Sequence, residues 1–292
     1  MSDPARTRTG PEDGDEDDGP PPRSPGDVLA PGYRVVAHLR RGHDLDVYDV
    51  WSETRECRCI AKTARPDLLH THSARARVLR EGRLLLRLTH PHIVRAYEVV
   101  TAPLPLVILE TLPGETLAHL IDRSGKRLPA LEIAQLGLHL CSAVGYLHRN
   151  DILHLDLKPA NIIATQGLAK LLDLSLARAP GPHRGGIGTP GYMAPEQVAG
   201  GNLGFHTDVW GLGATLYEVA TVVPACDAED ESTGAAWNRA RDACTPLPVR
   251  RGRRLPASLA NAIDHCLNQE PDNRPTVREL GQRLEEFVRS TS

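Results

Sequence analysis

Two short segments in the middle of the chain carry side chains that suit phosphoryl transfer. The segment His154-Leu155-Asp156-Leu157-Lys158-Pro159-Ala160-Asn161 places a carboxylate, an ammonium and an amide on one stretch rich in loop formers. A few residues later, Leu171-Leu172-Asp173-Leu174-Ser175 ends an apolar run in a second carboxylate. Phosphoryl transfer depends on positioning, charge neutralisation and a group that accepts the hydroxyl proton. Because Mg²⁺ prefers oxygen ligands, Asn161 and Asp173 together predict a metal site.

Lysine is scarce in this chain, so each lysine is informative. Only four of the 34 basic residues are lysines: Lys62, Lys126, Lys158 and Lys170. Arginine therefore stands wherever either base would serve. Two of the four lysines, Lys62 and Lys158, lie in segments that could contact phosphate.

The hydrophobic pattern predicts a strand-rich part followed by a helix-rich part. Alternating apolar runs predict five strands, at 33–39, 47–51, 57–62, 93–100 and 104–110. A helical period predicts one helix among them, at 73–88, and later helices at 130–149, 207–222, 256–267 and 275–289. This order indicates an α+β fold of two lobes with a cleft between them.

Over residues 33 to about 287 the chain resembles the protein-kinase family. The resemblance rests on the HxDxKxxN spacing from His154 and on six further matches in the expected order: Cys59-Ile60-Ala61-Lys62, Glu81, Asp173, Met193-Ala194-Pro195-Glu196, Asp208-Val209-Trp210-Gly211-Leu212-Gly213 and Asp272-Asn273-Arg274-Pro275. Each match alone has an ordinary structural explanation. The order and spacing of all seven matches distinguish the family resemblance from coincidence. The resemblance implies the bilobal kinase fold, with a β-rich N-lobe over residues 33–111 and a helical C-lobe over residues 112–288.

The resemblance also implies roles for individual residues. Asp156 becomes the catalytic base, Lys158 a γ-phosphate contact, and Asn161 and Asp173 the ligands of Mg²⁺, or of Mn²⁺ in its place. Lys62 becomes the contact to the α- and β-phosphates of ATP and Glu81 its ion-pair partner, while Arg274 pairs with Glu196. The remaining nucleotide contacts implied are Leu39, Gly42, Val47, Ala61, Glu110, Leu112 and Ile163, with Leu109 as gatekeeper.

Two details favour serine or threonine as the acceptor in a protein substrate. Lys158 follows the base by two residues, and Gly188-Thr189-Pro190-Gly191-Tyr192 precedes Met193. Both are forms found in serine/threonine members of the family. Thr189 is then expected to hydrogen-bond toward Asp156 and Lys158.

The phosphate-covering loop departs from the family pattern. Where the family has GxGxxGxV, this chain reads Arg40-Arg41-Gly42-His43-Asp44-Leu45-Asp46-Val47, so only the middle glycine remains. Glycine is favoured there because its backbone approaches phosphate closely. Asp44 and Asp46 are expected to add negative charge near the phosphates, which Arg40 or Arg41 could offset.

The activation segment, which the resemblance implies between Asp173 and Glu196, also departs from the family pattern. Leu155 replaces the arginine before the catalytic aspartate, and Leu174-Ser175 replaces Phe-Gly. Residues 177–187 contain no serine, threonine or tyrosine. We therefore predict that phosphorylation in this segment does not switch activity.

Two other functions stay open at this stage. A pseudokinase that binds or scaffolds with little turnover is favoured by the degenerate loop, whereas a small-molecule kinase is disfavoured by the signatures at 193–196 and 272–274. An active enzyme is favoured by the joint retention of Lys62, Glu81, Asp156, Lys158, Asn161 and Asp173.

Composition limits the partners and the location. The net charge of -3 and pI near 6.5 give no basic field for nucleic acid. The six dispersed cysteines predict reduced thiols, and no apolar run of 18 residues is apparent, so we expect a cytoplasmic protein without a membrane span. Residues 1–28 are acidic and proline-rich and predict a disordered tail. The sequence indicates neither the protein substrate nor the oligomeric state.

Overall fold

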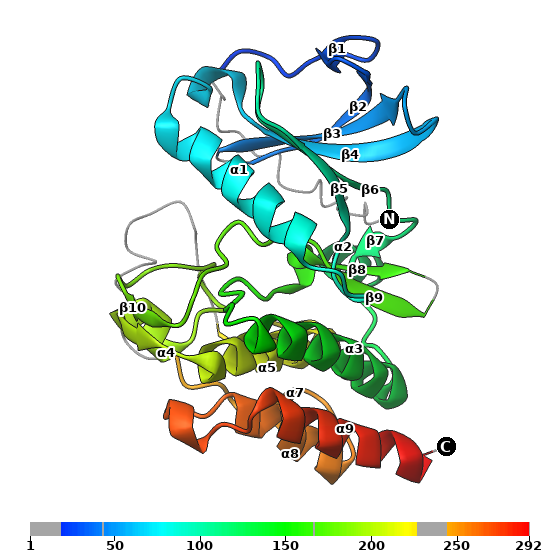
Figure 1. Cartoon of the computed structure of the whole chain (residues 1–292). Coiled ribbons are helices and arrows are strands. Elements are labelled where there is room, and N and C mark those ends of the chain that lie inside the picture. Colours follow the sequence, from blue (N-terminus) through cyan, green and yellow to red (C-terminus); the bar gives the residue numbers. More distant parts are fainter. Residues whose placement is uncertain (1–18, 43, 166, 227–243, 292) are drawn as a thin grey trace, which may run out of the picture.

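A computed structural model describes residues 19–42, 44–165, 167–226 and 244–291. These residues form two lobes, with a sheet and the long helix α1 in one and most of the helices in the other (Figure 1). The predicted bilobal α+β fold is confirmed.

The N-lobe is built on a six-stranded antiparallel sheet in the order β1-β2-β3-β4-β6-β5. Its strands are β1 (Val28–Ala30), β2 (Tyr33–Arg41), β3 (Leu45–Ser52), β4 (Cys57–Ala64), β5 (Ala96–Val100) and β6 (Leu106–Glu110). Side chains alternate between the two faces of β6. Leu106 and Ile108 join one hydrophobic cluster with Ala61, while Val107 and Leu109 join the other, which includes α1.

Helix α1 (His72–Arg87), which follows the short helix η1 (Pro66–Leu68), packs across this sheet (Figure 1). Val78, Glu81 and Leu85 are buried at helical spacing, so Glu81 lies on the buried face. Gly82 allows the close approach to the sheet, because a Cβ there would lie 2.6 Å from Val99 Cγ2. The packing of α1 thus directs Glu81 toward β4.

The N-terminal segment departs from the prediction of a tail that continues to residue 28. β1 adds a sixth strand to the predicted five, and the Pro20 carbonyl accepts a 3.0 Å hydrogen bond from Arg41. The Gly26 amide donates to the Val35 carbonyl at 2.9 Å. The Val35 amide also donates to the Asp27 carbonyl at 2.8 Å, so backbone bonds satisfy the edge of β2, which composition alone does not reveal. The acidic run at 12–18 lies outside the described residues.

The C-lobe holds the remaining elements. Its strands are β7 (Glu115–Thr116), β8 (Ile162–Thr165), β9 (Leu168–Leu171), β10 (Gly181–His183) and β11 (Gly201–Leu203). Its helices are α2 (Leu117–Ser124), α3 (Ala130–Arg149), η2 (Pro159–Asn161), α4 (Pro195–Ala199), α5 (Phe205–Thr221), α7 (Val249–Gly252), α8 (Ala257–Cys266), η3 (Pro271–Asn273) and α9 (Val277–Thr291). Helix α5 is buried from Thr207 to Thr221 and forms the centre of the lobe.

Within the described residues, α3 alone is long and apolar enough to cross a membrane by length and composition. The sequence prediction had found no such run. Nine of its residues are buried, and it packs against α5, α9 and β9. That is the pattern of the core helix of a lobe.

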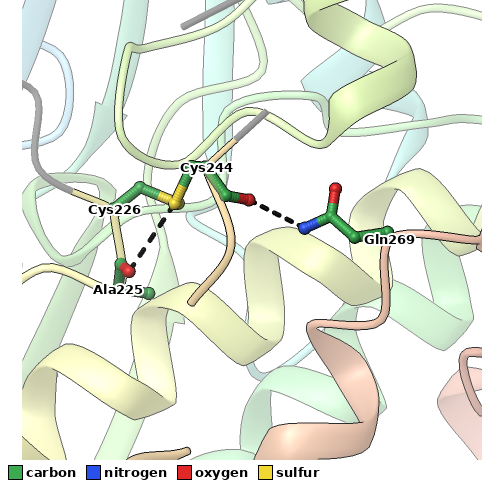
Figure 2. Close-up of a disulfide and its surroundings, with 4 residues drawn as sticks. All are labelled: Ala225, Cys226, Cys244 and Gln269. Carbon is green, nitrogen blue, oxygen red and sulfur yellow. Dashed lines mark hydrogen bonds between the residues drawn. A yellow bond between two sulfur atoms is a disulfide. The ribbon is translucent and has the colours of Figure 1, made fainter. Parts of the chain in front are cut away.

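The prediction of six reduced cysteines is wrong for two of them. Cys226, which follows α5, forms a disulfide with Cys244, which precedes α7 (Figure 2). The Cys244 carbonyl also accepts a 2.7 Å hydrogen bond from the Gln269 side chain. Cys57, Cys59, Cys141 and Cys266 are free, and Cys57 and Cys59 lie on one face of β4 as predicted, with sulfurs 4.0 Å apart. The pairing arises because the fold brings together two segments that are 18 residues apart.

Candidate active site

A cleft of about 580 Å³ lies between the lobes. Eleven of the thirteen predicted site residues line it: Leu39, Gly42, Val47, Lys62, Glu110, Leu112, Asp156, Lys158, Asn161, Ile163 and Asp173. Leu109, the expected gatekeeper, lines it as well. The fold therefore collects in one cavity residues that are spread over more than a hundred positions of the chain.

Ala61 is corrected to Ile60 as the β4 residue that faces the cleft beside Lys62. Ala61 is fully buried in the cluster on the opposite face of the sheet, whereas Ile60 lines the cavity and pairs with Leu109. Alternate residues of a strand share a face, so a cleft-facing Lys62 places Ile60 there too. The period of two was the signal that could have found Ile60 from the sequence.

Lys62 lies between two carboxylates. Its Nζ is 2.8 Å from Glu81 Oε1 and 3.3 Å from Asp173 Oδ2. Burial favours the neutral amine, but the charges of Asp173 and Glu81 outweigh it and raise the pKa of Lys62. Burial likewise opposes ionisation of Asp173, yet the Lys62 charge and hydrogen bonds from Ser175 hold its pKa well below the usual range. The site therefore keeps an ammonium and a carboxylate charged away from bulk water.

The segment between α3 and β8 carries Asp156, Lys158 and Asn161, and Thr189 from the segment before α4 bonds to the first two. Thr189 Oγ1 donates to Asp156 Oδ1 at 2.6 Å and accepts from Lys158 Nζ at 2.5 Å. Lys158 Nζ is also 3.2 Å from Asp156 Oδ2. Asn161 Nδ2 donates to the backbone carbonyl and to Oδ2 of Asp156, both at 2.8 Å. The predicted hydrogen bonds of Thr189 are confirmed, and they connect the segment before α4 to the candidate base.

Asp208 at the start of α5 holds this segment from below. Its carboxylate accepts from the backbone amides of His154 and Leu155 at 2.9 Å each and from His148 Nε2 at 2.8 Å. Burial opposes its ionisation, but these hydrogen bonds and the neighbouring histidines lower the pKa of Asp208. Leu155 has φ of 66°, a left-handed conformation that costs a non-glycine residue about 1–3 kcal/mol. The sequence predicts Asp208 at the start of a helix and within a family signature, whereas its role as a backbone anchor depends on the tertiary structure.

The residues fit a magnesium-nucleotide complex. Asn161 uses its amide nitrogen on Asp156, so its amide oxygen remains for a cation, and the Asp173 carboxylate lines the same cavity. Among the described residues no group of three histidine, cysteine or acidic side chains could hold a metal by itself. Mg²⁺ commonly uses only one or two carboxylates and takes its other ligands from phosphates and water. Two oxygen donors are therefore sufficient here.

Both acidic residues of the phosphate-covering loop are paired with arginines, and Arg41 offsets the charge of Asp46 as the sequence predicts. Asp46 is fully buried, and its carboxylate pairs with Arg41 at 2.9 Å and with His38 at 3.1 Å. It therefore adds no uncompensated charge at the cleft, because these side chains enclose it. Asp44 lines the cleft but forms an ion pair with Arg77 of α1. The sequence predicts no role for Arg77.

A second predicted ion pair lies beneath the activation segment. Arg274 donates to Glu196 in a two-bond arrangement, at 2.7 and 2.9 Å. The guanidinium is buried 5.1 Å from the ring centre of Trp210. The expected Glu196–Arg274 pair is confirmed, and it joins α4 to the segment before α9.

Comparisons with known proteins agree with this geometry. The protein kinase domain pattern matches residues 33–284. The serine/threonine-protein kinase PknB of Mycobacterium tuberculosis is 33% identical over 263 residues, and that of Mycobacterium leprae is 30% identical over 262. Each match covers 85% of this chain and 40% of the relative.

A streptomycete protein is similar too. The serine/threonine-protein kinase PkaA of Streptomyces coelicolor is 34% identical over 218 residues, which cover 71% of this chain and 39% of the relative. The chain thus spans about 40% of the length of these three relatives. By its cleft, its motifs in order and these matches, the chain belongs to the protein kinase family.

Proposed function

We propose that this chain is a serine/threonine protein kinase that transfers the γ-phosphoryl group of ATP to serine or threonine hydroxyls of proteins. The observation that carries the proposal is the hydrogen-bonded set of Asp156, Lys158, Asn161 and Thr189, of which the first three line one cleft with Lys62 and Asp173. We also propose that residues 33–288 form the kinase domain, with the lobes meeting between residues 111 and 112.

Each residue has a stated task in this proposal. Asp156 orients the acceptor hydroxyl and takes its proton at a carboxylate oxygen, and Lys158 binds the γ-phosphate. Lys62, held by Glu81, binds the α- and β-phosphates. Magnesium, when bound through Asn161 and Asp173, supplies charge neutralisation on the phosphates.

The base of the nucleotide is proposed to lie deeper in the cleft. Val47 and Ile60 line its upper side and Ile163 its lower side, and all three are apolar. Backbone groups of Glu110 and Leu112 provide hydrogen bonds at the hinge. Leu39 and Gly42 complete the roof, and Leu109 limits the depth.

The retained cleft residues favour an active enzyme over the pseudokinase alternative, which only the degenerate phosphate-covering loop favours. The relatives named above are serine/threonine protein kinases, and Lys62 and Asp173 keep their charges in the cleft. We propose a cytoplasmic location because ATP is the phosphoryl donor.

The test compares the wild type with Asp156→Asn. Purified protein is incubated with γ-labelled ATP, Mg²⁺ and a mixture of serine- and threonine-containing peptides. Loss of a general base typically costs about 100- to 10,000-fold in rate, so we expect a fall of that size in kcat with ATP affinity retained. Asp151→Asn, an exposed carboxylate five residues earlier, is the matched control. Near-normal turnover by Asp156→Asn would sink the assignment of the base, and label on tyrosine would contradict the acceptor class.

A further inference from the structure

The phosphate-covering loop is tied to helix α1 by an ion pair. Asp44 lies in the turn between β2 and β3, and its Oδ2 bonds to Nη1 of Arg77. The two residues are 33 positions apart, and both line the cleft. The Asp44 side chain is only 18% exposed, so the pair is partly shielded from water.

The backbone of the turn is fastened as well. The Gly42 amide donates to the Leu45 carbonyl at 2.8 Å, which closes the turn. The Asp44 carbonyl accepts from the Arg65 amide at 3.0 Å, and Arg65 directly follows β4. Asp44 is therefore held through its backbone and its side chain on the path that leads to α1.

Arg77 has a further significance because of its position on α1. It precedes Glu81 by one helical turn, so both side chains project from the same side of the helix. Glu81 bonds to Lys62 at 2.8 Å. One helix thus holds the proposed phosphate lysine through Glu81 and the phosphate-covering loop through Arg77.

The phosphate-covering loop has only one of the three family glycines, so an ion pair that holds it in place has a purpose. Without its flanking glycines the loop has less backbone freedom to close on phosphate by itself. An unpaired Asp44 would also repel a triphosphate, whereas the Arg77 guanidinium compensates its charge. We propose that the Asp44–Arg77 pair is a clamp that holds this loop over the phosphates of ATP, and that both are positioning residues for ATP binding. The proposal rests on the proposed function in that ATP is the ligand of the cleft.

The clamp and a simple charge effect predict opposite signs. If Asp44 only repels phosphate, Asp44→Asn strengthens ATP binding. If Asp44 holds the loop, the same change weakens ATP binding even though it removes a negative charge. A partly exposed pair is worth up to about 1 kcal/mol, which corresponds to roughly two- to five-fold in Kd.

The experiment measures the Kd of the full chain for a fluorescent ATP analogue with Mg²⁺, together with KM and kcat for peptide phosphorylation. The variants are Asp44→Asn, Arg77→Gln, the double variant, and the exchanged pair Asp44→Arg with Arg77→Asp. We expect each single variant to raise Kd and KM two- to five-fold with a smaller change in kcat. The double variant is expected to have a Kd no higher than that of the single variant that binds ATP less tightly. The exchanged pair is expected to recover part of the lost affinity. Arg83→Gln, an exposed arginine of α1, is the matched control.

The dependence of Kd on ionic strength is a second measurement. It would not differ between wild type and Asp44→Asn if the pair had only a structural role. Because the pair is partly exposed, the difference in Kd between wild type and Asp44→Asn should shrink as ionic strength rises. Tighter or unchanged binding by Asp44→Asn, or additive losses in the double variant, would overturn the clamp. A wild type that binds ATP without transferring phosphate defeats the proposed function while the Kd comparison still decides the clamp. A wild type that binds no ATP defeats both.

Discussion

The Lys62 ammonium forms ion pairs with two acidic side chains at once. Glu81 and Asp173 lie on either side of its ammonium, at 2.8 and 3.3 Å. Burial raises the pKa of Glu81, and the Lys62 charge opposes this shift and favours the ionised carboxylate. Removing the ammonium therefore affects the proposed phosphate contact and both acidic neighbours.

Lys62→Met tests this residue because methionine keeps an unbranched apolar stem. We expect kcat/KM to fall by at least about 100-fold, as the loss of a buried charged contact of about 3 kcal/mol implies. The fold should persist, as judged by circular dichroism. Lys126→Met, at an exposed lysine of the C-lobe, is the control. Unchanged phosphotransfer would mean that another base, such as Arg40, carries out the role.

The activation segment is an element held in place by contacts that need no phosphate. Arg80 of α1 donates to the Ser175 carbonyl at 2.6 Å, and Leu153 and Arg178 exchange backbone hydrogen bonds of 2.7 and 3.0 Å. β10 then pairs with β11, and Gln197 donates to the carbonyls of Leu155 and Ile187 at 2.9 and 2.8 Å. Order in the segment therefore comes from backbone pairing and side-chain amides.

We predict that phosphatase treatment leaves the rate of peptide phosphorylation unchanged. The segment offers only Ser175, Thr189 and Tyr192 as acceptors, and Thr189 is already bonded to Asp156 and Lys158. The measurement is the rate before and after treatment, with phosphosites mapped by mass spectrometry. A large loss of activity that follows dephosphorylation of one of these three residues would contradict the prediction.

The disulfide is the second element with a measurable consequence. It joins Cys226, which packs in the main hydrophobic cluster, to Cys244, and Gln269 bonds to the Cys244 carbonyl (Figure 2). A cross-link over a loop of this length reduces the entropy of the unfolded chain and typically stabilises by about 2–4 kcal/mol.

Replacing both Cys226 and Cys244 by alanine should lower the free energy of unfolding by about 2–4 kcal/mol. Wild type in excess dithiothreitol should match the variant, and the variant should be insensitive to the reductant. Urea unfolding with and without reductant measures this, with Cys57→Ala as control because Cys57 is free and exposed. Equal stability of oxidised and reduced wild type would argue against a stabilising role.

At the scale of the whole molecule, the two lobes are joined by backbone as well as by the cleft. The Val94 amide donates to the Leu171 carbonyl at 2.8 Å, and the Leu171 amide donates to the His92 carbonyl at 3.0 Å. This is why the predicted strand at 93–100 is shorter in the structure. Ile93 bridges to Leu171 of the C-lobe, and β5 begins at Ala96.

Acid stability should depend on Asp208 of α5, which bonds to His148 of α3 and to the backbone of His154 and Leu155. Its pKa is lowered in the folded protein, so below an ordinary carboxyl pKa of about 3.9 the unfolded chain binds more protons. The contribution of Asp208 is thus complete above about pH 4 and is lost as pH falls through the folded pKa. His154 acts in the same direction from a higher pH, because burial lowers its pKa in the folded protein.

We expect Asp208→Asn to cost about 2 kcal/mol at pH 7 and the difference from wild type to narrow below about pH 4. Urea unfolding between pH 7 and pH 3 measures both. Asp151→Asn, at an exposed carboxylate in the same region, is the matched control. A constant difference across the range would show that the Asp208 charge does not contribute.

Much of this protein could be predicted from local sequence. Asp156, Lys158 and Asn161 lie within six residues, so the chain itself keeps them close whatever the rest of the fold does. The two lobes followed from the change of hydrophobic period along the chain. Such features depend on residues that are neighbours in the chain or on one turn of one element, where spacing alone sets geometry.

Tertiary structure decided the rest. The Cys226–Cys244 bond, the burial of Asp46 under Arg41, and the tie between Asp44 and Arg77 each depend on how separate segments pack. The same residue types at the same spacings could have remained apart, because an ion pair or a disulfide forms only where the backbone brings two side chains within reach. Chain-local spacing thus determined which chemistry this protein carries, and packing between distant segments decided how its phosphate-covering loop is held.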